Sequence, residues 1–480
     1  MLRRLGSVAA KAPRWHVAIV GSGPAGWYTA DQLLKSSPDV CVDIYERLPV
    51  PFGLVRYGVA PDHQTVKNVT DRFGQIASDE RCSLIGNVCI GMGGIGADSA
   101  AHLPLEALQQ NYNAVLLSYG ASADRMLGVP GEDLAGVCAA RSFVEWYNGH
   151  PESPVDAFDL SKVETAVIVG NGNVALDCAR LLCSTPDELV GSDVTEHAAA
   201  ELARSAVRQV VLLGRRGALQ AAFTIKELRE LTKRDGATMS LEVGADAFSE
   251  AVMSFAGKDR ARKRLVELMQ KVSSPEPEAP PASPPDGKKA IRVQFQRSPT
   301  AFLPAADDPA SLGGARIVRT ALEGEPSHAQ RAVPIEGSEY ELPCQLAMRA
   351  IGYKSLPIEG APFDARRGVV PNSLGRVDGA PGLYVAGWLK RGPSGVILTN
   401  VTDANETAAM ILEDRAAGLL DGAADGGAAI RPLIGAQGKP LVDFEGWRRV
   451  DEEEMRRGAL VKKAREKVIS EAEMLQIAGA

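Results

Sequence analysis

Two strand–turn–helix patterns constrain this chain more than any other feature, because each contains a glycine-rich turn of the type that binds a dinucleotide. The first turn follows the apolar run 16–20 and reads Gly21-Ser22-Gly23-Pro24-Ala25-Gly26. The second follows the apolar run 166–169 and reads Gly170-Asn171-Gly172-Asn173-Val174-Ala175. Two such turns predict two bound dinucleotides, and the most common chemical reason to bind two is hydride transfer from a nicotinamide to a flavin.

Each position in these turns has a physical reason. The first glycine allows the tight turn from strand to helix, and the second lets the backbone approach a pyrophosphate. The third residue must be small so that the helix packs on the strand, and Gly26 and Ala175 both satisfy this condition. The N–H groups and the positive dipole end of each helix then face the phosphates. The alternative is that both are ordinary structural turns.

The composition limits the classes of protein that fit. The chain has 480 residues, enough for two or three domains, with 45% hydrophobic and 24% charged residues. Its formal net charge of −7 argues against general nucleic-acid binding, and no apolar run is long enough to span a bilayer. The seven cysteines include no CxxC pair, which argues against a zinc site, an iron–sulfur cluster or a redox disulfide within the chain.

The N-terminal segment is basic and resembles a targeting sequence. Residues 1–14 contain four basic residues, and the first acidic residue is Asp31. The apolar run is too short for a secretory signal, so the segment is predicted to be a mitochondrial presequence. The alternative is a disordered basic tail.

The first unit is predicted to bind the flavin dinucleotide, FAD. Its second strand, 40–45, ends at Glu46, which lies about 20 residues after the glycine turn, the spacing at which a carboxylate hydrogen-bonds a ribose. The apolar runs 84–90 and 114–118 fit further parallel strands of the same sheet.

The second unit carries arginines where a carboxylate would serve NAD. Its second strand is predicted at 210–213, and Gly214-Arg215-Arg216-Gly217 follows it. Guanidinium groups suit a 2′-phosphate, so the second cofactor is predicted to be NADP. The gap before Arg215 is about twice the usual length, so residues 184–206 should form an excursion from the βαβ unit. The alternative is that the arginine pair is a solvated surface.

A third strand–glycine–helix element near the end of the chain indicates the domain order. It comprises a strand at 383–387, Trp388, a turn at 391–395 and a helix to about residue 412. We therefore predict an α/β fold with two Rossmann-like dinucleotide-binding domains, the NADP domain being inserted into a discontinuous FAD domain. The predicted order is the presequence (1–14), the first segment of the FAD domain (15–122), the NADP domain (123–351, with a proline-rich insertion at 273–287) and the second segment of the FAD domain (352–480). Within the NADP domain, residues 258–270 are predicted to form a helix that begins with the basic run 258–264. Within the second segment of the FAD domain, the charged stretch 451–467 is predicted to be a surface helix.

Several longer motifs resemble those of the adrenodoxin reductase family, the mitochondrial ferredoxin–NADP reductases. They are residues 50–63, 172–177, 214–217, 223–230 and 387–395, in the order of the family. The resemblance implies FAD contacts by Ala25, Glu46, Leu54, Ile90, Trp388, Gly395, Val396 and Ile397. It implies NADP contacts by Asn171, Gly172, Asn173, Val174, Arg215, Arg216 and Glu227. It also implies a location in the mitochondrial matrix, without a transmembrane segment. Peripheral contact with the inner membrane is a further expectation.

The reaction that the resemblance implies runs from NADPH through FAD to a [2Fe–2S] ferredoxin, one electron at a time. Because this chain lacks cluster-spaced cysteines, the iron must lie in the partner. Such a ferredoxin is acidic, so docking requires a local basic patch, for which the candidates are Arg260, Arg262, Lys263 and Arg264. The alternative is a solvated helix face.

Three residues are candidates for the chemistry. Trp388 is predicted to pack against the flavin ring, the alternative being an ordinary core tryptophan. His63 and Asp177 are the only His–Asp pair near both turns in the sequence and are predicted to relay a proton. The alternative is a loop histidine and a helix carboxylate without such a role.

Three other classes of protein share features with this sequence. A flavin disulfide reductase needs a redox cysteine pair, and a glutamate synthase small subunit needs cluster-binding cysteines ahead of the first strand. Neither set of cysteines is present in the sequence. A nucleotide-sensing protein would keep both folds without the aromatic and glycine groups around the flavin, and bleaching of a yellow protein by NADPH separates this class from an enzyme.

Overall fold

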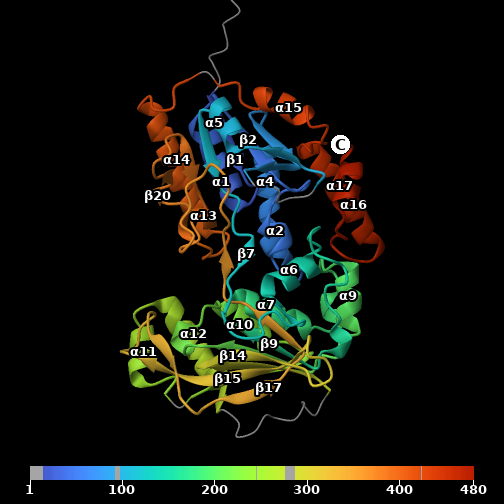
Figure 1. Cartoon of the computed structure of the whole chain (residues 1–480), viewed down its shortest axis with the longest axis vertical. Coiled ribbons are helices and arrows are strands. Elements are labelled where there is room, and N and C mark those ends of the chain that lie inside the picture. Colours follow the sequence, from blue (N-terminus) through green and yellow to red (C-terminus); the bar gives the residue numbers. More distant parts are fainter. Residues whose placement is uncertain (1–14, 92–97, 245, 276–286, 423) are drawn as a thin grey trace, which may run out of the picture.

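The structure, a computed structural model, describes residues 15–91, 98–244, 246–275, 287–422 and 424–480. It contains two α/β domains, which lie one above the other in Figure 1. We call the upper one the outer domain, because it is built from both ends of the chain, and the lower one the inserted domain. The predicted presequence and most of the proline-rich insertion lie outside the described residues. Within the described residues, no helix is both long and apolar enough to cross a membrane.

A seven-stranded sheet forms the centre of the outer domain. β1 lies between β2 and β6, and β22 continues the sheet in parallel beyond β6. Because β22 comes from the last quarter of the chain, the chain returns to its first sheet after the inserted domain, which confirms the predicted fold class. In spatial order the strands are β20 (Asn372–Ser373), β21 (Arg376–Val377), β22 (Leu383–Val385), β6 (Ala114–Leu117), β1 (Trp15–Val20), β2 (Val40–Glu46) and β3 (Cys82–Gly86).

Helices cover both faces of this sheet. One face packs against α1, α4, α14, α16 and α17 through buried side chains such as Trp27, Phe73 and Ile411. The other face packs against α5, α15 and a small two-stranded pair formed by β4 (Val88–Ile90) and β5 (Ala101–Leu103). The helices of the outer domain are α1 (Pro24–Ser36), α2 (Leu54–Tyr57), α3 (Gln64–Lys67), α4 (Val69–Ala77), α5 (Leu105–Asn111), α13 (Trp388–Arg391), α14 (Thr399–Ala416), α15 (Gly427–Gly435), α16 (Phe444–Leu460) and α17 (Glu471–Ala478).

The inserted domain has a seven-stranded sheet in which every neighbouring pair is parallel. Its spatial order is β12 (Ser273–Pro275), β11 (Ala237–Val243), β13 (Lys289–Phe295), β10 (Gln209–Gly214), β9 (Thr165–Val169), β18 (Leu346–Arg349) and β8 (Val137–Ala139). Helices cover one face of this sheet: α6 (Ala140–Asn148), α7 (Asn173–Leu182), α8 (Pro186–Leu189), α9 (Glu196–Ala203), α10 (Ile225–Leu231), α11 (Glu250–Ala256) and α12 (Arg260–Val272). Parallel strands covered in this way are buried on both faces, which explains their continuous apolar runs.

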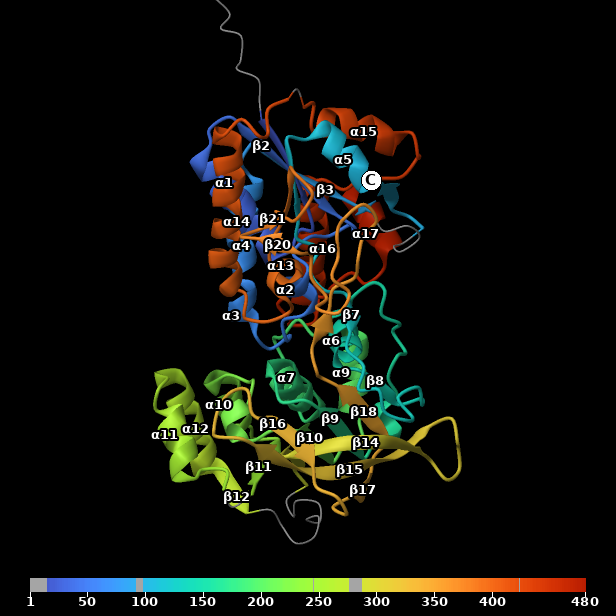
Figure 2. The same ribbon diagram turned by 60° about the vertical axis from the view of Figure 1, so that its left-hand side comes forward.

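An antiparallel sheet, which the sequence analysis did not predict, covers the second face. It contains β14 (Arg297–Pro304), β15 (Leu312–Glu323), β16 (Arg331–Pro334) and β17 (Tyr340–Pro343). Val167 and Leu213 of the parallel sheet pack here against Phe302 and Ile317. The inserted domain is therefore a three-layer structure (Figure 2).

A two-stranded ribbon carries the chain between the domains. β7 (Ala123–Asp124) pairs antiparallel with β19 (Tyr353–Lys354), so both crossings occur at one place. The ribbon lies near the middle of the interface in Figure 1. Both crossings adjoin the boundaries predicted near residues 122 and 352.

Some predicted elements differ in extent or burial. The apolar run 84–90 forms two strands, because Asn87 has a φ of 65° and β4 (Val88–Ile90) then pairs with β5 (Ala101–Leu103). The predicted excursion at 184–206 is present and contains α8 and α9. The surface helix predicted over 451–467 is present only in part: α16 exposes charged residues such as Glu452 and Arg456 but ends at Leu460, and Glu454 and Lys467 are buried. Charge density alone did not distinguish these two buried charges, which are paired inside the protein.

Candidate cofactor-binding site

The first glycine turn, between β1 and α1, has the geometry that a pyrophosphate requires. Gly21 has a φ of +104°, and a Cβ there would lie 2.6 Å from Tyr119 Cα, so only glycine fits. A Cβ on Gly26 would overlap the Gly21 carbonyl oxygen, so this position also requires glycine. By contrast, a Cβ on Gly23, the N-cap of α1, would meet no atom within 4 Å. That open space beside the first N–H groups of α1 fits a phosphate.

Glu46 is held beside the first turn. Its Oε2 accepts hydrogen bonds from Ser22 N at 3.2 Å and Ser22 Oγ at 2.6 Å. The carboxylate therefore lies at the carboxyl end of β2, where a ribose ligand belongs. Of the other residues predicted to contact FAD, Ala25 and Ile90 are buried, and Leu54 is half-buried at the start of α2.

The second glycine turn, between β9 and α7, repeats this geometry. Gly170 has a φ of +129°, and a Cβ there would overlap the Ala350 carbonyl oxygen. A Cβ on Gly172, the N-cap of α7, would meet no atom within 4 Å. The predicted contact residues Asn171, Asn173 and Val174 lie next to Gly172 in the sequence. Asn173 Oδ1 also accepts a hydrogen bond from Thr224 N at 2.8 Å, which places the start of α10 beside the turn.

Arg215 and Arg216 leave β10 next to the second turn. A Cβ on Gly214, the residue before the arginine pair, would lie 2.8 Å from Asn171 Nδ2. The arginines therefore follow a residue that contacts the second glycine turn. Arg215 is exposed, and Arg216 Nη1 donates a hydrogen bond to His328 O at 2.9 Å. Burial, followed by the charge of Arg215, lowers the pKa of Arg216. Two adjacent guanidinium groups of this kind suit a phosphate monoester.

The third turn, after β22, lies against the first. A Cβ on Gly387 would lie 2.7 Å from Ala25 Cβ, and the Asp403 carboxylate accepts a hydrogen bond from Gly387 N. Trp388 begins α13, and its ring centroid lies 5.3 Å from that of Tyr353.

The segment that leads from this turn into α14 exposes apolar side chains. Gly395 has a φ of +85°, Ile397 is half-buried, and Val396 and Leu398 are 53% and 72% exposed. Exposed apolar side chains beside a nucleotide-binding turn fit an aromatic cofactor ring that would cover them.

A buried charge cluster joins the two domains. The Arg180 cluster, as we call it, consists of Asp62 and His63 from the outer domain and Asp177, Arg180, Glu227 and Glu230 from the inserted domain. Arg180 donates to Asp62 at 2.7 and 2.9 Å, and its Nη2 lies 2.8 Å from Asp177 Oδ1. His63 Nε2 lies 2.7 Å from Glu230 Oε2 and 3.8 Å from Glu227 Oε2. The hydrogen-bond partner of His63 is therefore Glu230, whereas Asp177 pairs with Arg180.

The electrostatics of the Arg180 cluster favour retention of a proton. Burial raises the pKa of Asp177, and burial together with the Asp177 charge raises that of Glu227. Although burial acts in the opposite sense, hydrogen bonds from Arg180 hold the pKa of Asp62 below its ordinary value. His63, Glu227 and Glu230 are also close enough to ligate a metal, but the Arg180 guanidinium, 3.5 Å from both glutamates, already supplies a cation there.

Sequence reasoning missed Arg180 and Glu230. The only signal for Arg180 was its spacing of three residues from Asp177, which places both side chains on one face of a helix. Glu230 lay within a recognised motif but received no role.

The predicted basic run begins α12. Arg260, Lys263 and Arg264 are exposed, whereas Arg262 is half-buried and its Nη1 donates to Ala221 O at 2.6 Å. α10 lies beside α12 in Figure 2 and adds the exposed basic residues Lys226 and Arg229, and Lys233 follows in the turn after α10. The sequence analysis did not predict a role for these three residues.

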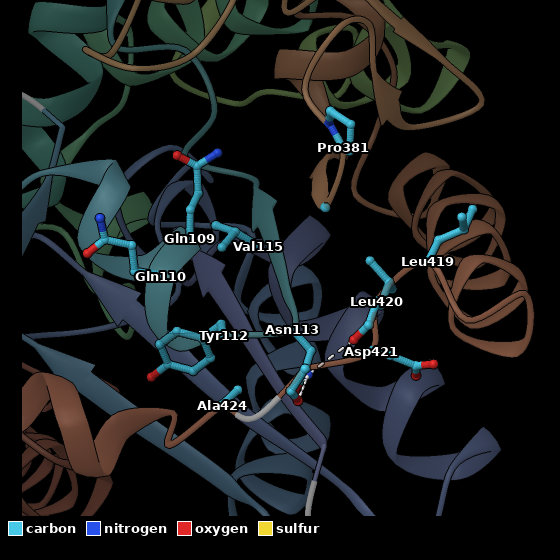
Figure 3. Close-up of a pocket in the computed structure, with 12 residues that line it drawn as sticks. Gln109, Gln110, Tyr112, Asn113, Val115, Pro381, Leu419, Leu420, Asp421 and Ala424 are labelled. Atoms are coloured by element: carbon cyan, nitrogen blue, oxygen red, sulfur yellow. Dashed lines mark hydrogen bonds between the residues drawn. The ribbon is translucent and has the colours of Figure 1, made fainter.

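A small cavity in the outer domain lies away from the glycine turns. It has a volume of about 280 Å³ and is lined by residues such as Gln110, Asn113 and Leu420 (Figure 3). Asn113 Nδ2 donates to Leu420 O at 3.2 Å. Because Asn113 precedes β6, the cavity is at the amino end of the strands, opposite to the end where α/β sheets bind nucleotides.

Comparison with known proteins agrees with this geometry. Residues 15–234 match the pyridine nucleotide-disulphide oxidoreductase family. The mitochondrial NADPH:adrenodoxin oxidoreductase of Homo sapiens is 46% identical over 477 residues, which cover 98% of this chain and 93% of that protein. The corresponding protein of Arabidopsis thaliana is 41% identical over 487 residues, covering 100% of this chain and 98% of that protein.

A solved structure extends the similarity to three dimensions. FprA of Mycobacterium tuberculosis in complex with NADPH is 35% identical, has a TM-score of 0.87, and covers 97% of this chain and 100% of its own. The similarity thus includes both domains and the way in which they are joined. On these grounds the chain belongs to the NADPH:adrenodoxin oxidoreductase family, as its motifs predicted.

Proposed function

We propose that this chain is a mitochondrial reductase that passes electrons from NADPH through FAD to a [2Fe–2S] ferredoxin. The observation that carries the proposal is the pair of glycine turns, each with an open space at its middle glycine and at a helix N-terminus. Relatives named for NADPH and adrenodoxin or ferredoxin support it. Bound FAD would accept a hydride from NADPH and return the two electrons singly.

The outer domain is assigned the FAD. The N-terminus of α1 binds its pyrophosphate at Gly21, Gly23 and Gly26, and Glu46 binds its ribose. Trp388 and the segment Gly395-Val396-Ile397 would contact its ring and exclude water. The N-terminus of α14, an 18-residue helix that begins at Thr399 after Leu398, would stabilise negative charge at the ring.

The inserted domain is assigned the NADP. The N-terminus of α7 binds the pyrophosphate at Gly170 and Gly172, and Arg215 and Arg216 bind the 2′-phosphate. The Arg180 cluster is assigned the protons of the reaction: His63 is hydrogen-bonded to Glu230, and Asp177 and Glu227 are the carboxyl groups with a raised pKa. We therefore assign the proton relay mainly to the His63–Glu230 pair, and Asp177 has a secondary role in it.

The ferredoxin is assigned to the exposed basic side chains of α10 and α12. An acidic partner is attracted by this surface although the whole chain carries a net charge of −7. Arg262 was predicted from the sequence to be part of this surface. We assign it a structural role instead, because its guanidinium donates a hydrogen bond to Ala221 O.

Spectroscopy tests the proposed reaction. The purified protein should be yellow, lose its flavin absorbance on anaerobic addition of NADPH, and regain it on addition of an oxidised [2Fe–2S] ferredoxin. A colourless protein, or a flavin that NADPH leaves oxidised, would contradict the proposal.

Charge reversal tests the docking surface. The triple variant Arg260→Glu, Lys263→Glu and Arg264→Glu should reduce ferredoxin-linked cytochrome c reduction by roughly ten- to hundredfold, since each pair contributes up to about 1 kcal/mol before repulsion is added. Reduction of ferricyanide by NADPH should persist, because ferricyanide needs no docking surface. The matched control reverses three exposed charges on the α16 side of the molecule, Arg448, Arg456 and Lys462, and should affect neither assay. If the test and control variants lose ferredoxin-linked cytochrome c reduction equally, the assignment of the docking surface to α10 and α12 is wrong.

The location has separate tests. Import of the full chain into isolated mitochondria, with loss of an N-terminal segment, tests the presequence. Peripheral contact with the inner membrane remains a prediction, and sedimentation of the purified protein with cardiolipin-containing vesicles tests it.

A further inference from the structure

The segment that connects α16 to α17 lies against both domains. We call residues 461–468 the strap. In Figure 1 the lower end of α16 approaches α9 at the edge of the interface, at a distance from the β7–β19 ribbon near its middle. The strap belongs to the outer domain by sequence, so its contacts with the inserted domain join two separately built units.

Three strap side chains contact the inserted domain. Lys463 Nζ donates to Val194 O at 2.9 Å, and Glu466 Oε1 accepts a hydrogen bond from Glu196 N at 2.8 Å. Lys467 Nζ donates to Asn148 Oδ1 at 3.1 Å and lies 3.2 Å from Asp193 Oδ2. These contacts reach α6, α9 and the loop before α9.

The other end of the strap is anchored in the outer domain. Val468 N donates to Glu454 Oε1 at 2.9 Å, and Glu454 also forms a buried ion pair with Arg56. Arg465 Nη1 lies 2.5 Å from Asp451 Oδ1 on α16. The strap is therefore fixed on one side before it reaches across to the inserted domain.

The contact at Lys467 has an unusual composition. Two ammonium groups share one carboxylate, because Lys67 Nζ lies 2.6 and 2.7 Å from the two Asp193 oxygens. The side chains of Lys467 and Asp193 are both 1% exposed. Burial lowers the pKa of Lys467 well below its ordinary value, although Asp193 opposes this. Replacing a buried ion pair by apolar side chains of similar volume often costs no stability, so stability alone is weak ground for placing charges here.

We propose that Lys467 is a positioning residue, which together with Asp193 and Asn148 holds the inserted domain at the angle required for hydride transfer. The ribbon alone is a single attachment, about which one domain can turn relative to the other. The Asp62–Arg180 and Lys67–Asp193 pairs add further attachments, and the strap adds its own at the edge of the interface, on the carboxylate that Lys67 also contacts. Because misplacement by about 1 Å can cost about a hundredfold in rate, a small rotation is sufficient to matter.

The variant Lys467→Met tests the proposal in the holoenzyme, since it keeps the length of the side chain and removes the charge. The rate constant of flavin reduction by NADPH, measured by stopped flow, should fall ten- to hundredfold. The FAD content and the NADPH dissociation constant should remain within about threefold, because neither nucleotide site is touched.

Spin labels measure the position of the domains independently of activity. Labels are placed at Lys35→Cys of the outer domain and Lys162→Cys of the inserted domain, both exposed, in a Cys138→Ser background. The distribution of label distances should broaden in Lys467→Met. If that variant does not fold, Lys463→Met, which loses the hydrogen bond to Val194 O, provides the same comparison.

Lys439→Met is the matched control. It makes the same substitution, removes a hydrogen bond to Asp98 O within the outer domain and leaves the strap and the Lys467 contact in place, so the rate and the distances should remain those of the parent. The proposal is overturned if the two variants behave alike, or if the rate and the distance distribution fail to change together in Lys467→Met. The inference rests on the proposed function, but the two can fail separately: a parent protein whose flavin NADPH does not reduce contradicts the function, whereas unchanged distances in Lys467→Met contradict the strap.

Discussion

Gly172→Ala should weaken NADPH binding while leaving the fold and the flavin intact. Gly172 has φ −96° and ψ 177°, a conformation that any residue adopts, and its added Cβ would meet no protein atom within 4 Å. The methyl group would instead occupy the open space at the N-terminus of α7. Alanine is therefore compatible with the protein at this position and incompatible with the phosphate.

The expected magnitude follows from the contact that the methyl group displaces. A hydrogen bond between a backbone N–H and a charged phosphate is worth about 1.5–3 kcal/mol, so losing one should raise the NADPH dissociation constant roughly ten- to hundredfold. Gly23→Ala should weaken FAD binding in the same way, because Gly23 has φ −76° and an equally open Cβ position in the first turn. That variant should lose FAD and keep its melting temperature as apoprotein close to that of the parent apoprotein.

The assays are flavin absorbance per polypeptide, titration with NADPH, and thermal unfolding. Gly170→Ala is the control, because its φ of +129° and its overlap with the Ala350 carbonyl oxygen should lower the melting temperature whether or not nucleotide is present. If Gly172→Ala is destabilised as much as Gly170→Ala, the space is not open. If it binds NADPH with the parental affinity, the phosphate does not lie there.

Three further perturbations test other regions of the structure. Arg215→Ala and Arg216→Ala should each lower the ratio of kcat/KM for NADPH to that for NADH roughly ten- to hundredfold, by loss of a charge-assisted hydrogen bond; unchanged ratios in both would contradict the NADP assignment. Burial lowers the pKa of His150 to about 4 from its ordinary value of 6.5, so acid protonates the unfolded chain first. Stability from this group is complete above pH 6.5 and falls toward pH 4, with a loss of roughly 2–3 kcal/mol by about pH 4.5, and in His150→Gln the free energy of unfolding should fall less steeply with acid. Arg180→Met leaves four carboxylates without their guanidinium and should lower the free energy of unfolding by about 3–5 kcal/mol, measured by denaturant titration; an unchanged midpoint would mean that these charges are solvated.

Sequence reasoning succeeded where the chemistry is local. Each glycine turn lies within one βαβ unit, and Glu46 lies in the same unit as the first turn, so spacing alone relates them. The first glycine of each turn has the positive φ that a tight turn from strand to helix requires. The Arg180 cluster and the strap were not predicted, because Asp62 meets Arg180, and Lys467 meets Asp193, across the domain interface. Composition likewise cannot tell a solvated charge from a paired one, as Arg262 and Lys467 illustrate.

The place of β22 in the outer sheet has a consequence for the order in which the protein matures. Until β22 emerges from the ribosome, β6 presents an unpaired edge, and the strand that covers it is synthesised only after the whole inserted domain. The inserted domain has no such delay, because its two ends meet at the β7–β19 ribbon and its own sheet is complete by then. Nascent chains should therefore acquire a folded inserted domain while the outer domain still exposes a sheet edge, which is the interval in which aggregation competes with folding.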